Sequence, residues 1–107
     1  MDTQFKKGIL EMCILYQLAD TETYGYEVMK IIKEVFPDVY DASIYAILRR
    51  LNAENFTETF MKDSDSGPPR KYYRITQSGM KYLHQMISEW DFMVSAVKGL
   101  GIGTKDS

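Results

Sequence analysis

The chain has 107 residues, of which 45% are apolar and 26% are charged, and its formal net charge is −2. This balance excludes a disordered chain, a fibre and a generally basic nucleic-acid coat, and it fits one domain whose single core is small enough that dimerisation is expected. The lone cysteine, Cys13, excludes a disulfide framework and a cysteine zinc site within one chain, and without a signal-peptide layout or a bilayer-length apolar stretch a cytoplasmic protein is expected.

The first predicted helix covers residues 5–18, and apolar side chains occupy nearly every side of it. Its two neighbouring apolar stripes are formed by Ile9, Met12 and Tyr16, and by Leu10, Ile14, Leu15 and Leu18. Such a helix is buried on two sides, and Cys13 is expected to be buried within it.

A second helix is predicted after a connection over residues 20–23. Tyr24 and Gly25 open it, and Pro37 ends it because proline lacks the amide hydrogen that a helix interior needs. Its apolar face is formed by Val28, Ile31, Ile32 and Val35.

A third, short helix is predicted to begin at Asp41 or Ser43, since both side chains can cap free amide groups. Its apolar positions with helical spacing are Ile44, Ile47, Leu48 and Leu51. Asn55 can end it, because asparagine tolerates the left-handed conformation that is common just past a helix end.

A hairpin and a long helix complete the predicted elements. Residues 56–62 and 70–75 are rich in Phe, Thr and Tyr and flank a polar tip with Gly and Pro, which predicts two paired strands with a mobile tip, called the wing below. Thr76 suits the N-cap of the last helix, whose coiled-coil-like seam is formed by Met80, Leu83, Ile87, Trp90, Val94 and Val97. Nothing later in the chain provides a partner for this seam.

The element order predicts a mainly α fold of the α+β winged-helix class: a helix-turn-helix, a two-stranded β wing and one long C-terminal helix. We expect a winged-helix domain over residues 1–75, a dimerisation helix over 76–98 and a flexible tail over 99–107. Positive charge is local, in Arg49 and Arg50 and in the segment from Lys62 to Arg74.

Three stretches resemble the PadR family of winged-helix transcriptional repressors. They are Tyr24-Gly25-Tyr26-Glu27, the segment from Ser43 to Leu51, and the segment from Gly67 to Thr76 with Gly79. The likeness covers about residues 5 to 97. Tyr40 departs from the family pattern, which usually has a small capping residue there, and Asn55 stands where the family often has Gly. The single helix after the wing resembles the short members of the family.

The resemblance implies a dimeric repressor that binds double-stranded DNA at a roughly palindromic operator, with half-sites about one helical turn apart. The residues expected to contact DNA are Tyr24, Tyr26, Ser43, Tyr45, Arg49, Lys62, Arg70 and Lys71. For Tyr45 the alternative is packing in the core. Tyr73 and Ile75 are expected on the core face of the wing.

In the short members the last helix pairs with the first helix of the other subunit, and multidrug-binding members place a Trp at the position of Trp90 that stacks on flat aromatic ligands. A small aromatic or hydrophobic effector is therefore a candidate ligand at the dimer interface, with Trp90 as a mere dimer anchor as the alternative. The residues expected there are Ile9, Met12, Met86, Ile87, Trp90, Met93 and Val94.

Other function classes have less support. His84 is the only histidine, no nucleophile and base are paired, and no glycine loop for phosphate precedes a helix, so neither an enzyme nor a metal or cofactor site is expected. His84 is expected to face solvent or pack on the wing. A winged-helix adaptor that binds proteins without specific DNA binding is the alternative, because the acidic balance disfavours non-specific DNA affinity.

Overall fold

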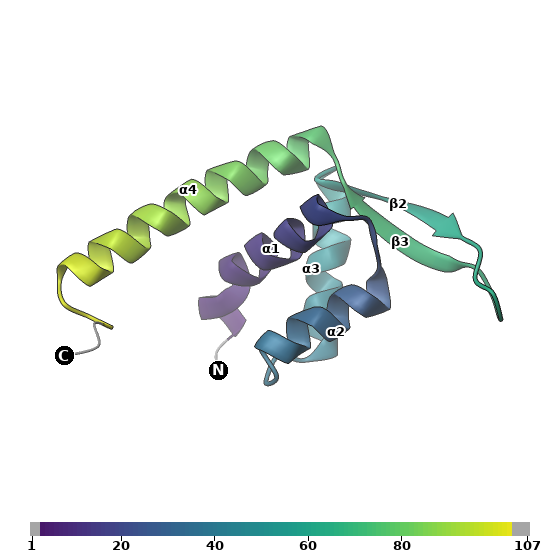
Figure 1. Cartoon of the computed structure of the whole chain (residues 1–107), viewed down its shortest axis with the longest axis horizontal. Helices are drawn as coiled ribbons and strands as arrows, with labels where there is room; N and C mark the ends of the chain where they lie inside the picture. Colours follow the sequence, from purple (N-terminus) through teal and green to yellow (C-terminus); the bar gives the residue numbers. More distant parts are fainter. Residues whose placement is uncertain (1–2, 104–107) are drawn as a thin grey trace.

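The structure, a computed structural model, describes the backbone of residues 3–103 and the side chains of residues 6–103. Along this range the elements are α1 (Thr3–Asp20), β1 (Thr23–Tyr24), α2 (Gly25–Val35), α3 (Asp41–Ala53), β2 (Thr57–Lys62), β3 (Arg70–Ile75) and α4 (Gln77–Gly99). Figure 1 shows α1, α2 and α3 grouped together, the wing extending to one side, and α4 running along α1 and projecting beyond it on the other. The predicted winged-helix fold is confirmed. Of the predicted tail, residues 104–107 lie outside the described residues, and Gly99 still belongs to α4.

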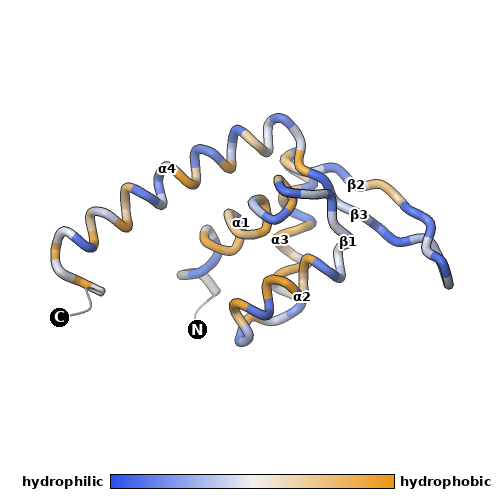
Figure 2. The backbone as a smooth tube through the Cα atoms, viewed as in Figure 1, coloured by the Kyte–Doolittle hydropathy of each residue, from blue (hydrophilic) through white to orange (hydrophobic). Residues whose placement is uncertain are grey.

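Helix α1 lies at the centre of the core, where it packs against α2, α3, α4 and β3. Leu10, Ile14 and Leu15 have no exposed surface, and Figure 2 shows apolar residues concentrated in α1, α2 and α3. The predicted burial of α1 on two sides is confirmed. Cys13 is only half-buried, contrary to expectation, because it faces an apolar groove among α1, α2 and α4. Partial burial raises the pKa of its thiol.

Helix α2 ends where the sequence predicts, one residue before Phe36 and two before Pro37. Val28 and Ile32 on the predicted apolar face are buried, whereas Val35 at its end is 67% exposed and lines a groove with Ile31 and Ile32. The helix terminates at Val35, and the neighbouring apolar surface of α1 remains open there as a groove.

The loop after α2 is tied to α1 by an ion pair. Lys6 is 3% exposed, and its Nζ lies 2.9 Å from Oδ1 of Asp38 and 5.5 Å from the centre of the Phe36 ring. The hydrogen bond from Lys6, acting with weaker contributions, lowers the pKa of Asp38 to about 2. Because the folded-state pKa lies below the ordinary value of about 3.9, this interaction stabilises the fold above pH about 4 and is lost as the pH falls towards 2.

We therefore expect Lys6→Met to raise the pKa of Asp38 towards its ordinary value, because the variant removes the donor that favours the carboxylate. A carboxyl NMR titration of both chains measures the change. An unchanged pKa in the variant would show that other groups hold the carboxyl ionised.

Helix α3 begins at Asp41, within the predicted range, but its N-cap is Tyr40, whose side chain makes no capping hydrogen bond. The expected capping by Asp41 or Ser43 is therefore wrong. The other end of the helix follows the prediction: Asn55 adopts a φ of 65°, and the amide of Phe56 donates to the carbonyl of Leu51 at 2.9 Å. This pair of features is a Schellman motif, which turns the chain sharply into β2.

The sheet has three antiparallel strands in the order β1-β3-β2, one more than predicted. Thr57 pairs with Ile75 and Lys62 with Arg70, which confirms the hairpin. The added strand consists of Thr23 and Tyr24, which were predicted as a connection and a helix start. Two residues are too few to show strand alternation in a sequence, and they pair because the packing of α1 and α2 brings them to the free edge of β3.

Helix α4 is docked at its start onto the turn between α3 and β2. Thr76 is its N-cap, as predicted, and accepts a hydrogen bond from the amide of Gly79 at 3.0 Å. The hydroxyls of Thr76 and Ser78 both donate to the carbonyl of Asn55, at 2.7 and 2.9 Å. The Tyr82 ring stacks on Phe56, with centres 4.3 Å apart.

The first half of α4 finds its partner within the same chain, which the sequence did not indicate. Leu83 is 2% exposed, and the half-buried Ile87 packs against the core. Beyond this point the helix leaves the body of the molecule, and Met93 and Val97 are 58% and 41% exposed. Only the outer half of the predicted seam is therefore without a partner among the described residues.

Candidate nucleic-acid interface

The start of α2 and the wing, which were predicted separately as DNA-contacting elements, meet at Tyr24. This residue is both the end of β1 and the N-cap of α2. The guanidinium carbon of Arg70 lies 5.0 Å from the centre of the Tyr24 ring, and the Tyr26 and Tyr72 rings lie 6.2 and 5.9 Å from it. Stacking of a cation on an aromatic ring holds both groups in place. The structure thus brings Tyr24, Tyr26 and Arg70 into one cluster.

The wing carries its cations on both faces. Side chains of successive strand residues point to opposite sides, so Arg70 shares a face with Tyr72, and Lys71 shares the core face with the buried Tyr73. Lys71 remains exposed, with its Nζ 5.8 Å from the centre of the Tyr73 ring. The Nζ of Lys62 lies 5.0 Å from the centre of the Tyr72 ring and 3.8 Å from a carboxylate oxygen of Glu22.

The tip of the wing is closed by its own hydrogen bonds. The hydroxyl of Ser64 donates to the carbonyls of Gly67 and Pro68, at 3.2 and 3.0 Å. Gly67 has a φ of 114°, a backbone conformation that residues other than glycine rarely adopt. Asp63 and Asp65 make the tip acidic, so the cations lie on the arms of the wing instead.

Tyr45 of α3 was predicted either to contact DNA or to pack in the core, and the structure places it partly in the core. The ring is half-buried and packs against the core. Burial raises the pKa of its hydroxyl, and the charge of Asp41 raises it further, so the group stays a neutral donor at physiological pH. Weaker electrostatic effects on it come from Tyr24 and Tyr26, so Tyr45 lies near the cluster at the start of α2.

The exposed face of α3 contains both predicted DNA contacts and further residues that were not predicted there. Arg49 is exposed, as a DNA contact requires, and Ser43 is half-buried. Asp41, Ala42 and Ala46 are also exposed, and Nζ of Lys33 lies 2.6 Å from Oδ1 of Asp41. Helical spacing opposite to the predicted buried positions was the signal that could have identified them.

Arg50 does not extend the basic surface that the sequence suggested for Arg49 and Arg50. Its guanidinium forms an ion pair with Glu11 of α1, and Nη1 lies 3.5 Å from Oε2 of Glu54. The side chain therefore faces inward, and only Arg49 of this pair is directed to solvent.

The residues expected at a dimer interface line two apolar grooves beside α1 and α4, the second of which also borders α2. One groove, of about 350 Å³, is bordered by Ile9, Met12, Met86, Trp90 and Met93 together with Gly8 and Glu89. The other, of about 320 Å³, also includes Met12 and Trp90, and Ile87 joins them there. Val94 lies one turn beyond Trp90 and is half-buried. Trp90, 40% exposed, is shared by both grooves.

Other kinds of site find little support within residues 6–103. No three His, Cys, Asp or Glu side chains described here come together as metal ligands would. His84 is exposed on α4, which agrees with the first of its two expected environments. None of the described helices has the length and apolar character needed to cross a membrane.

Comparisons with known proteins agree with this arrangement. Residues 14–85 match the model of the transcriptional regulator PadR-like family. The crystal structure of a PadR-like transcriptional regulator from Bacillus cereus is 38% identical in sequence and superposes with a TM-score of 0.83. The match covers 94% of this chain and 99% of that one. A Streptococcus transcriptional regulator is 31% identical with a TM-score of 0.85, over 94% of this chain and 99% of that one. An uncharacterised protein X of Lysinibacillus sphaericus is 33% identical over 87 residues, which cover 78% of this chain and 80% of that protein.

Proposed function

Because this chain belongs to the PadR-like family of DNA-binding transcriptional regulators, we propose that it is a dimeric repressor of a palindromic operator. Repression would follow from occupation of a site that the polymerase needs. Such a protein acts on the chromosome, and we place it in the cytoplasm. The described residues offer no catalytic constellation that would compete with this function, and the family is one of regulators.

The observation that carries the proposal is the stacking of Arg70 on Tyr24. It links the wing to the start of α2, and Tyr45 of α3 lies near the same cluster, which supports one surface built from the three elements proposed to contact DNA. In this proposal α3 enters the major groove and reads base edges with Ser43, Tyr45 and Arg49. The phosphate contacts come from Tyr24, Tyr26, Lys62, Arg70 and Lys71.

The dimer is proposed from the outer half of α4. Trp90, Met93 and Val97 form an exposed apolar face, and the two grooves beside α1 are apolar as well. Exposed apolar surface of this extent is typical of an interface. A two-fold axis would let α4 of each copy cover the α1 and α4 grooves of the other, so one patch would serve both subunits.

We expect Met93→Glu to weaken the dimer at least about tenfold, because two carboxylates would be buried near the axis without partners. Met93 is 58% exposed in the single chain, so the variant keeps its fold. Light scattering across a dilution series measures the dimer constant, and circular dichroism verifies the fold. His84→Glu adds the same charge at an exposed α4 position outside both grooves and should leave the dimer intact.

We further propose that a small aromatic or hydrophobic effector binds at Trp90. Trp90 borders both grooves together with Met12, a flexible side chain that adapts to different ligands. A ligand there relieves repression only if it binds better to a dimer that fits the operator poorly. Titration with flat aromatic dyes should quench Trp90 fluorescence, and an unquenched signal would leave Trp90 as a dimer anchor alone.

Fluorescence anisotropy with DNA from upstream of the gene, a scrambled control and a salt series tests the repressor function. Preferential, salt-sensitive binding that saturates at one dimer per palindrome is the expected result. Equal or absent binding to both DNAs would instead favour a distant operator or the protein-binding adaptor.

A further inference from the structure

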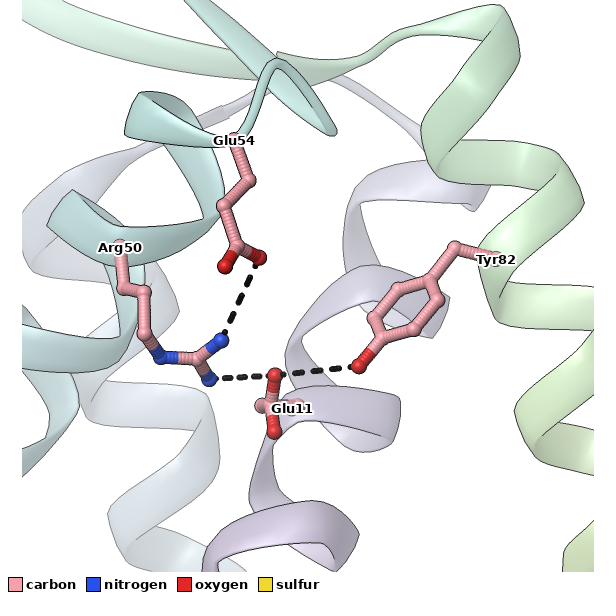
Figure 3. A network of polar contacts seen from close by, with 4 residues as sticks. All are labelled: Glu11, Arg50, Glu54 and Tyr82. Atoms are coloured by element: carbon pink, nitrogen blue, oxygen red, sulfur yellow. Dashed lines mark hydrogen bonds and ion pairs between the residues drawn. The ribbon is translucent and has the colours of Figure 1, made fainter.

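A polar network joins α1, α3 and α4 in the interior of the molecule (Figure 3). Glu11 of α1 is at its centre, forming an ion pair with Arg50 of α3 through Oε1. The hydroxyl of Tyr82 of α4 donates to the same carboxylate oxygen at 3.5 Å. Glu54, at the end of α3, contacts the other side of the Arg50 guanidinium.

The burial of Glu11 makes this network a geometric constraint. Its side chain is 8% exposed, whereas that of Arg50 is 31% exposed. A buried carboxylate loses its hydration and is tolerated only where its partners stay in place. A buried ion pair adds little stability relative to apolar packing, but it favours one arrangement of the elements that carry it. Glu11 therefore disfavours arrangements in which α3 or α4 moves away from α1.

The protonation states suit this role. The hydrogen bond to Glu11 raises the pKa of Arg50. Burial raises the pKa of Tyr82, and the charge of Glu11 raises it further, so the hydroxyl keeps its proton and remains a donor.

A second set of contacts fixes the same two helices at the chain turn. The carbonyl of Asn55, just past α3, accepts hydrogen bonds from Thr76 and Ser78 at the start of α4. The Tyr82 ring lies parallel to that of Phe56, with an angle of 8° between the planes. Tyr82 thus belongs to both sets: its ring holds α4 to the turn, and its hydroxyl holds α4 to Glu11.

We infer that Glu11 and Tyr82 are positioning residues, which fix α3 relative to α4 and thereby set the separation of the two α3 helices in the dimer. This inference rests on the proposed function. The contact between α3 and α4, made by Glu11, Tyr82 and the turn at Asn55, is called the joint below. A tilt of about 10° at the joint moves a point ~20 Å away by about 3.5 Å, which is close to one base-pair step. Even small motions at the joint would therefore widen the range of half-site spacings that the dimer binds.

The direct test measures the distance between the two α3 helices. A spin label is attached at Ala46→Cys, on the exposed face of α3, in a Cys13→Ala background. Pulsed electron paramagnetic resonance then measures the distance between the two labels in the dimer. A narrow distribution is expected for the parent, and a shifted or broadened one for Glu11→Gln with Tyr82→Phe. Tyr82→Phe alone keeps the stack on Phe56 and serves if the double variant does not fold.

The functional readout is operator spacing. Inserting or deleting one base pair between half-sites rotates one of them by about a tenth of a turn, and the parent should discriminate against this change. In the double variant, the ratio of affinities for the original and the altered spacing should fall about threefold or more, whereas affinity for a single half-site stays unchanged. Val28→Ala, a core truncation in α2, destabilises the domain without touching the joint and should keep the parent's spacing profile.

The outcomes distinguish a failure of the positioning role from a failure of the proposed function. An unchanged distance distribution or spacing profile in the variants would overturn the positioning role alone. A parent without any inter-label distance, or without preference for an operator, would overturn the proposed dimeric repressor and this inference with it.

Discussion

Replacing Arg70 and Lys71 together by alanine is expected to lower operator affinity about a thousandfold at about 0.15 M salt, with the fold intact. Both side chains are exposed, and neither belongs to the core. A dimer would lose four cations, and each lost phosphate contact lowers the slope of log affinity against log salt by about 0.9. Four contacts correspond to a slope change of about 3.6, which at this salt concentration gives the stated loss.

Arg70 contributes in a second way, because its guanidinium stacks on Tyr24. Its removal also frees the wing from the start of α2, so Arg70→Ala should cost more affinity than Lys71→Ala. The two single variants measure the contributions of the two faces of the wing separately, since these side chains point to opposite sides.

The matched control for this prediction removes the same charge elsewhere. Lys81 and Lys98 are exposed on α4, away from the wing. Lys81→Ala with Lys98→Ala changes the net charge by the same amount and should alter affinity only slightly. A comparable loss in both double variants would mean that overall charge, and not the wing, governs binding, and anisotropy titrations over a salt series distinguish the two.

Gly79→Ala is expected to destabilise the fold by about 3 kcal/mol, with a fall in Tm of roughly 10 to 20 °C. A Cβ at this position would lie 2.0 Å from the carbonyl oxygen of Phe56 and 2.7 Å from Cγ1 of Ile75. A backbone oxygen cannot yield as the end of a flexible side chain can, so α4 must move away from the turn. That movement would also strain the hydrogen bonds of Thr76 at the helix start.

Thermal and denaturant unfolding measure this loss. Gly99→Ala, in the last turn of α4, has no atom within 4 Å of the new Cβ and should change stability by less than about 0.5 kcal/mol. Equal Tm values for Gly79→Ala and the parent would show that the joint between α3 and α4 is soft, which would also weaken the case for Glu11 and Tyr82.

The sequence alone determined the features that depend on local chemistry. Asn55 at the end of α3, Thr76 at the start of α4 and the pairing of residues 57–62 with 70–75 follow the predictions, because caps and hairpins are set by neighbouring residues. The family was also evident from the segments around Tyr24, from Ser43 to Leu51 and from Gly67 to Thr76, and the fold agrees with it.

The tertiary structure alone decided which groups far apart in the chain come together. Arg50 appeared to be a surface cation beside Arg49, and only the approach of α1 supplies Glu11 as its partner. The strand at Thr23 and Tyr24 exists because β3 offers it an edge, and the stack of Arg70 on Tyr24 depends on that pairing. Long-range contacts of this kind carry no periodicity and no local signature in the sequence, since they arise from the packing of whole elements around the buried face of α1.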